Sequence, residues 1–113
     1  MAVKSTPSES LRSILRNTPH HKLVFVIFTG KSCFVCEKLR QHLPWFANAH
    51  REKIHVMAID TQKHPDLSTE YGVFAIPTIV VFSKGERILT EMGVDSKDQL
   101  KSMLKTALRA STP

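Results

Sequence analysis

The two cysteines of this 113-residue chain, Cys33 and Cys36, are separated by two residues. They follow an apolar run at residues 23–28 and precede a helical pattern at residues 37–49, so we expect a strand, a turn and a helix whose first turn carries Cys33. Backbone N–H groups and the dipole at a helix start favour negative charge, so a thiol there ionises more readily to the nucleophilic thiolate. Cys36, one turn further, can reach Cys33 and close a small ring. The spacing therefore predicts reversible thiol–disulfide exchange through a mixed disulfide.

Two other uses of the cysteine pair stay open. A zinc or iron–sulfur site needs about four ligands, and without a third cysteine a second chain or a histidine pair would have to complete it. An inert structural disulfide is the other alternative, which the strand–turn–helix setting disfavours. We expect no metal and no cofactor, because the six histidines lack metal-ligand spacing: His20, His21, His42, His50, His55 and His64.

Length and composition indicate one domain, residues 1–113, with a modest core. A hydrophobic content of 42% with 23% charged residues is ordinary for a globular protein. Residues 1–10 are polar, without an apolar segment of signal-peptide length, and no apolar run is long enough to span a membrane. We therefore expect a cytoplasmic protein with no membrane association, in which a disulfide is transient and catalytic.

The formal net charge of +6 could indicate an acidic partner. A basic, solvated surface is the simpler interpretation, because no aromatic residues interleave the charges as nucleic-acid binding would need. A basic stripe on the last expected helix is interpreted in the same way, as a solvated face opposite an apolar one: Lys97, Lys101, Lys105 and Arg109.

Strands alternate with helices along the chain until a final hairpin. Strands are expected at residues 23–28, 54–59, 78–82 and 87–91, with a short one at 2–4, and helices after Thr6, at 37–49, at 65–71 and after Ser96. This order predicts an α/β fold with a central mixed sheet of four to five strands, flanked by about four helices on both faces.

Several motifs, in order and in register, resemble the thioredoxin family over nearly the whole chain. They are the cysteine pair after an apolar strand, Asp60 at the end of the next strand, Tyr71-Gly72-Val73, Ile76-Pro77-Thr78, Lys84-Gly85-Glu86, and Gly93 before the last helix. The resemblance implies a single domain of the thioredoxin-like fold. It also implies a thiol–disulfide oxidoreductase that reduces protein disulfides.

The resemblance also assigns roles to individual residues. Cys33 would attack the substrate and Cys36 would resolve the mixed disulfide. Pro77 would form a cis bond facing the cysteines, whereas an ordinary trans proline at a strand start is the alternative. The backbone of Ile76 would pair with an extended substrate segment, and Gly93 would line the same groove.

The chain departs from the family pattern at the motif and in the core. Ser32 stands where thioredoxins usually have Trp, and Phe34-Val35 replaces Gly-Pro between the cysteines. We expect Ser32 and Phe34 to contact the substrate and the intervening pair to alter the redox potential. Ile27 and Val56 replace a buried Asp and its Lys partner, so the usual proton acceptor for the resolving thiol is absent.

The expected activity uses protein disulfides as substrates and a reductase or another dithiol as electron donor. Glutaredoxin shares the cysteine spacing and the proline, but the hairpin at Lys84-Gly85-Glu86 and the lack of a glutathione signature favour thioredoxin. The alternative function is a non-catalytic or weakly active module that holds a protein partner in its Ile76-Pro77 groove.

Overall fold

The strand β1 (Leu23–Thr29) lies inside the sheet, and all of its residues are buried. The structure is a computed structural model that describes residues 8–111. β1 pairs in parallel with β2 (Ile54–Asp60) and antiparallel with β3 (Thr78–Ser83), which pairs antiparallel with β4 (Glu86–Met92). The strand order is β2-β1-β3-β4, so the expected mixed sheet is confirmed with four strands in the described part of the chain.

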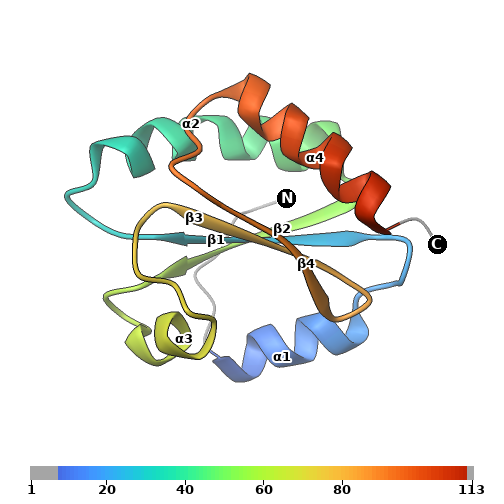
Figure 1. Cartoon of the computed structure of the whole chain (residues 1–113), viewed down its shortest axis with the longest axis horizontal. Coiled ribbons are helices and arrows are strands. Elements are labelled where there is room, and N and C mark those ends of the chain that lie inside the picture. The colour runs from blue at the N-terminus through green and yellow to red at the C-terminus, as the bar shows by residue number, and fades with distance from the viewer. Residues whose placement is uncertain (1–7, 112–113) are drawn as a thin grey trace.

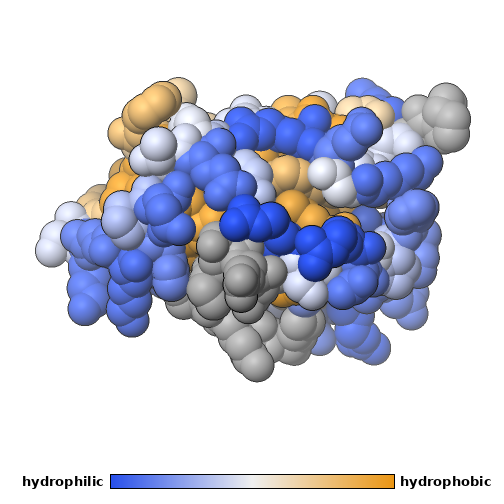
Figure 2. All heavy atoms as spheres, turned by 90° about the horizontal axis from the view of Figure 1, so that it is seen from below, coloured by the Kyte–Doolittle hydropathy of each residue, from blue (hydrophilic) through white to orange (hydrophobic). Residues whose placement is uncertain are grey.

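Two helices cover each face of the sheet (Figure 1). α2 (Phe34–Ala49) and α4 (Lys97–Ser111) lie on one face, while α1 (Ser8–Asn17) and α3 (Pro65–Glu70) lie on the other. Figure 2 shows the side of α1 and α3, where hydrophilic side chains cover much of the surface with apolar groups visible between them. This layered arrangement explains why the central strands are apolar on both faces.

The two faces of β1 contribute to two separate cores. Leu23, Phe25 and Ile27 pack in the core that includes side chains of α2 and α4, such as Leu39, Phe46 and Leu100. Val24, Val26 and Phe28 pack in the second core with Leu11 of α1 and Leu67 of α3. Because side chains alternate along a strand, a continuous apolar run serves both layers.

The helices and strands fall close to the positions expected from the sequence. α2 starts at Phe34 and therefore includes part of the motif, and the strands extend by a residue or two beyond the expected ranges. The possible strand at residues 2–4 and the expected helix cap at Thr6 and Pro7 lie outside the described residues. None of the described helices is long and apolar enough to cross a bilayer.

Local sequence signals determine where α4 begins and where the chain turns between β3 and β4. Ser96 caps α4, because its Oγ accepts from the Gln99 N–H at 3.2 Å while Gln99 Oε1 accepts from the Ser96 N–H at 3.1 Å. Lys84 and Gly85 have φ angles of 55° and 81° in the turn between β3 and β4. Two consecutive residues with positive φ are typical of the two-residue hairpin turn that matches strand twist.

Ile27 and Val56 lie at diagonal positions of the neighbouring strands β1 and β2, in the same core below α2 and α4. They are 1% and 2% exposed, and the partner of Val56 on β1 is Phe25, two residues from Ile27 on the same face. An apolar pair thus occupies the positions that the sequence resemblance assigns to a buried Asp and its Lys partner. The pair avoids the cost of taking two charges out of water.

We predict that Ile27→Asp lowers the free energy of unfolding by roughly 3 kcal/mol or more, because a buried carboxylate would have no partner. Adding Val56→Lys should recover part of this loss, since the ammonium would lie on the neighbouring strand. Urea unfolding of the three proteins measures the effect. Ile27→Val is the control and should cost only about 0.5–1.5 kcal/mol. Equal destabilisation of the single and double variants would show that the two positions do not interact.

Candidate active site

A disulfide joins Cys33 and Cys36 at the turn between β1 and α2, with the two Cα atoms 5.2 Å apart. This Cα separation is within the range of ordinary disulfides. The backbone at this turn therefore accommodates a disulfide between the two cysteines. No other cysteine exists in the chain to compete for either sulfur.

Cys33 is the N-cap residue of α2 rather than a member of its first turn, which corrects the expected position by one residue. Its backbone is extended, with φ −129°, and its Sγ accepts from the Cys36 N–H at 3.1 Å. Its carbonyl oxygen accepts from the Glu37 N–H at 3.0 Å. Because the sulfur itself caps the helix, the Cys36 N–H that it accepts from would also stabilise a thiolate at this position.

The two sulfurs differ in accessibility. Cys36 is 0% exposed, whereas Cys33 is partly exposed at the start of the helix. The turn before it is tight, since Ser32 has φ 54° in the left-handed region that few non-glycine residues adopt. A disulfide approaching from solvent can thus meet Cys33 but not Cys36.

The peptide bond between Ile76 and Pro77 is cis, as the sequence resemblance predicted. It brings the Ile76 carbonyl oxygen to 3.9 Å from Cys33 Sγ, across 43 positions of sequence. Pro77 is buried, while Ile76 is partly exposed. Main-chain atoms of the loop before β3 therefore lie directly beside the accessible sulfur.

Gly93 belongs to the same cluster of backbone. Its N–H donates to the Pro77 carbonyl at 3.0 Å, and its φ of 75° is in the region that favours glycine. Met92, the residue before it, pairs with Thr78 at the start of β3. The structure thus brings together the cysteine pair, the cis proline loop and Gly93, with Ser32 exposed on the turn beside them.

Three large apolar side chains are exposed in the described part of the chain, and all three are close in sequence or pairing to this cluster. Phe34 follows Cys33 and is 78% exposed, Phe74 precedes Ile76 by two residues and is 92% exposed, and Met92 is 70% exposed. Of these three side chains, only Phe34 was expected from the sequence to contact the substrate. Phe74 is an aromatic residue in the short loop between Gly72 and Pro77, and this position was the only sequence signal for it. Its exposure depends on the tertiary structure.

Charged side chains of α2 contact the end of β1 and the segment before α4. Arg40 forms an ion pair with Glu37, and its Nη1 donates to Thr29 Oγ1 at 3.1 Å. Lys38 forms an ion pair with Asp95 at 3.3 Å, and its ammonium lies 5.7 Å from the centre of the Phe34 ring. These contacts connect α2 to the end of β1 and to the segment before α4, so the helix that carries Cys36 is held on both sides.

Two titratable groups that do not contact the cysteine pair have shifted pKa values. Partial burial, with a smaller contribution from Lys22, lowers the pKa of His55, which pairs with Val24 near the start of β1. Partial burial and Glu70 raise the pKa of Tyr71, which packs on Phe28 and Phe82. Within residues 8–111 no three His, Cys, Asp or Glu side chains gather closely enough to hold a metal ion.

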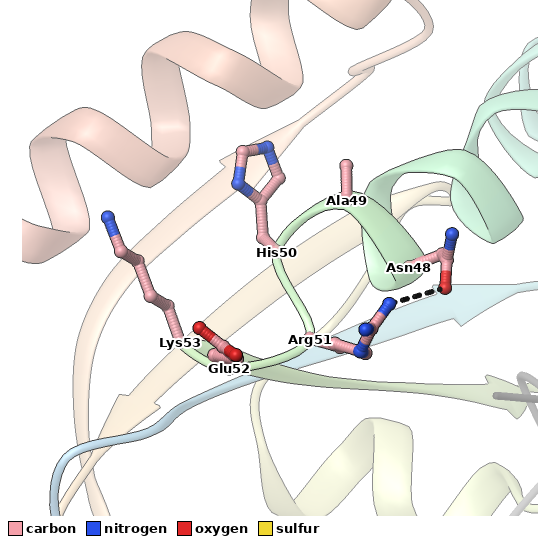
Figure 3. A pocket seen from close by; sticks show the side chains of 6 residues that line it. All are labelled: Asn48, Ala49, His50, Arg51, Glu52 and Lys53. Carbon is pink, nitrogen blue, oxygen red and sulfur yellow. Dashed lines mark hydrogen bonds between the residues drawn. The ribbon is translucent and has the colours of Figure 1, made fainter.

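A hollow at the turn between α2 and β2 offers no comparable arrangement (Figure 3). His50, Arg51 and Lys53 point in different directions there, and Arg51 Nη1 donates to Asn48 Oδ1 at 3.4 Å. The His50 ring packs on Phe46, with ring centres 5.4 Å apart. These side chains do not converge on one point, so the cysteine pair remains the candidate active site.

Comparisons with known proteins agree with this geometry. A family model described as thioredoxin matches residues 2–106. The chain is 30% identical over 88 residues to the thioredoxin of Alicyclobacillus acidocaldarius subsp. acidocaldarius, covering 78% of this chain and 84% of that protein. It is 31% identical over 105 residues to a thioredoxin-like protein of Synechocystis sp., covering 93% of this chain and 97% of that protein. The X-ray structure of Fasciola hepatica thioredoxin matches with a TM-score of 0.84 at 17% identity, covering 93% of this chain and 98% of that chain.

We predict that the Cys33 thiol reacts with alkylating reagents at a lower pH than an unperturbed cysteine. The Cys36 N–H and the start of α2 stabilise its thiolate. The rate of iodoacetamide alkylation against pH, measured in Cys36→Ser, reports the ionisation of Cys33 alone. A midpoint at or above that of a cysteine in a denatured sample of the same variant would contradict the prediction.

Proposed function

Because this chain belongs to the thioredoxin family, we propose that it is an oxidoreductase that reduces disulfide bonds in proteins, with Cys33 attacking and Cys36 resolving. The observation that carries the proposal is the partly exposed residue Cys33, whose sulfur caps α2 and is bonded to the fully buried Cys36. A nucleophile must be reached by its substrate, whereas a resolving thiol needs to reach only its partner.

The reaction begins with the reduced pair. The Cys33 thiolate attacks one sulfur of a substrate disulfide, forming a mixed disulfide and releasing the other substrate sulfur as a thiolate. The Cys36 thiolate then attacks Cys33 Sγ, releasing the second substrate thiolate and leaving the Cys33–Cys36 disulfide. Two electrons pass to the substrate, and both of its thiolates take up protons from water or from neighbouring groups.

The substrate is an extended protein segment bound along Ile76 and Pro77. The Ile76 carbonyl lies 3.9 Å from Cys33 Sγ, so strand-like pairing with Ile76 would hold a substrate cysteine beside the attacking sulfur. Gly93 donates to the Pro77 carbonyl and Ser32 and Phe34 flank Cys33 in the sequence, so we expect all three to contact the same segment. Main-chain pairing tolerates many sequences, which suits a reductase with several partners.

Regeneration of the pair requires an external electron donor, either a reductase or another dithiol. The chain would then take part in electron transfer and in redox homeostasis as one thioredoxin-like domain. We place it in the cytoplasm, where a disulfide of this kind is transient rather than structural.

A binding module without turnover is the second candidate function. Ser32 and the Phe34-Val35 pair replace the usual family residues around the cysteines, and Ile27 replaces the buried acid. Reduction of insulin in the presence of dithiothreitol distinguishes the two functions, because only an oxidoreductase accelerates it above the dithiothreitol background. Cys33→Ser is the matched inactive control.

We predict that Cys36→Ser retains substrates as mixed disulfides and that Cys33→Ser does not. The serine at position 36 cannot release the substrate, while a chain without Cys33 has no accessible thiol to form the bond. Non-reducing gels of purified variants, mixed with oxidised protein substrates, measure the trapped complexes. Equal trapping by both variants, or by neither, would favour the binding module.

The rate at which Cys36 resolves the mixed disulfide should depend on pH. Cys36 is fully buried, and burial disfavours its thiolate, so release of the substrate should be the slow step and should accelerate as pH rises. Ile27→Asp combined with Val56→Lys should accelerate release near neutral pH by supplying a proton acceptor. Stopped-flow release of a fluorescent mixed-disulfide substrate measures the step, with Ile27→Val as the control. A double variant no faster than the parent would show that proton acceptance at residue 27 does not limit the reaction.

A further inference from the structure

Four cations follow one another along the exposed side of α4, each four residues after the last. We call them the α4 stripe: Lys97, Lys101, Lys105 and Arg109. All four side chains are exposed, and within residues 8–111 none of them forms an ion pair. Four residues of an α-helix rise about 6 Å. The α4 stripe is therefore a row of positive charges at short, regular intervals that no acidic side chain neutralises.

Trp45 of α2 brings an aromatic ring to the start of the α4 stripe. α2 and α4 lie on the same face of the sheet (Figure 1). The ammonium groups of Lys97 and Lys101 lie 4.9 Å and 5.8 Å from the centre of the Trp45 ring. The ring is partly buried against the core, and its centre is 6.1 Å from the ring centres of both Phe46 and His50. Packing from α2 thus fixes a ring that two cations of α4 share.

The shared ring makes this end of the α4 stripe different from an ordinary solvated row of lysines. A lysine side chain is flexible, and it loses much of its rotamer freedom when it binds a partner. Contact with Trp45 restrains the ammonium groups of Lys97 and Lys101 in advance. It also holds two like charges beside one ring, so a carboxylate that approaches both would relieve their repulsion. Restraint of this kind lowers the entropic cost of binding an anion.

The surroundings of the α4 stripe favour an acidic protein over two other anionic partners. Nucleic-acid bases need a free aromatic face for stacking, whereas the Trp45 ring is partly buried and already in contact with two ammonium groups. A helix that lies on a membrane exposes large apolar side chains beside its charges. In α4 those side chains are buried in the core: Leu100, Met103 and Leu104.

A helical partner matches the α4 stripe better than an extended one. An extended segment gains affinity by main-chain pairing with a sheet edge, and a helix such as α4 has no edge to offer. A helix with acidic residues four positions apart presents its carboxylates at intervals of about 6 Å, the same interval as the cations of the α4 stripe. Such a helix, laid along α4, would place one carboxylate beside each cation.

We propose that the α4 stripe, with Trp45 as its positioning residue, is a docking surface for an acidic helix of a partner protein. The inference goes beyond the proposed function and does not depend on it, because the α4 stripe and Trp45 take no part in the cysteine chemistry. The formal net charge of +6 would also steer such a partner toward the chain from a distance.

Titration with model peptides tests the docking surface. The probe is a fluorescein-labelled, Ala-rich helical peptide of about four turns with Glu at every fourth position. Its matched control has Gln at the same positions. Anisotropy of the label gives the dissociation constant, which should exist only for the Glu peptide and should rise steeply with added salt. Trp45 is the only tryptophan of the chain, so its fluorescence should change in the same titration with unlabelled Glu peptide.

A pair of charge variants connects binding to the α4 stripe. Lys97→Gln with Lys101→Gln removes the two restrained charges and should weaken binding of the Glu peptide roughly tenfold. Arg16→Gln with Lys63→Gln removes the same net charge from exposed positions in α1 and before α3, on the other face of the sheet. This control should change the dissociation constant by less than about twofold, because only the long-range attraction is reduced.

Substitutions of Trp45 test whether its ring positions the lysines. Trp45→Leu removes the ring face and should weaken binding of the Glu peptide roughly threefold. Trp45→Phe keeps an aromatic face for the two ammonium groups and should retain most of the affinity. Urea unfolding of both variants identifies any loss that comes from the core contacts of Trp45. Equal affinity of the Leu and Phe variants would show that the ring does not position the lysines.

The other outcomes are equally informative. Equal binding of the Glu and Gln peptides would overturn the docking surface, and so would equal losses of affinity in the two charge variants. Oligothymidylate and vesicles containing phosphatidylserine are the competitors, compared with unlabelled Glu peptide at equal concentrations of negative charge. If either displaces the labelled peptide more effectively than the unlabelled peptide does, the α4 stripe binds a nucleic acid or a membrane, and the proposal is overturned.

Discussion

Burial of β1 on both faces is the constraint on which the rest of the structure depends. The strand packs below α2 and α4 on one side and above α1 and α3 on the other, so its apolar side chains are enclosed in one core or the other. Its end carries the turn to Cys33, and Arg40 of α2 donates to Thr29 at that end. A rigid strand therefore positions a reactive sulfur that itself lies at the surface.

The difference between the two cysteines follows from where α2 begins. Helix N-terminal N–H groups have no partners within the helix, and Cys33 Sγ takes one of them as the cap. One turn later the chain is inside the protein, and Cys36 is buried. A single helix start thus places a partly exposed cysteine at the cap and an enclosed cysteine bonded to it.

The departures from the family pattern make the interior more apolar, and exposed aromatic rings lie in the segments beside the site. Ile27 and Val56 remove a buried charge pair from the core, which favours stability because no desolvation has to be offset. Phe34 and Phe74 place aromatic rings on the surface near the cysteines. The fold of the family is unchanged, since the altered positions are compatible with the same strands and helices.

Hydrophobic periodicity, turn residues and the cysteine spacing determined the order of elements, the mixed sheet and the cysteine pair, because these are local signals. The same signals located Ser96 as a helix cap and the hairpin at Lys84-Gly85. The tertiary structure decided the contact between the Ile76 carbonyl and Cys33 and the exposure of Phe74. Such features depend on packing between segments far apart in the chain, and no local pattern encodes the distance between residues 33 and 76.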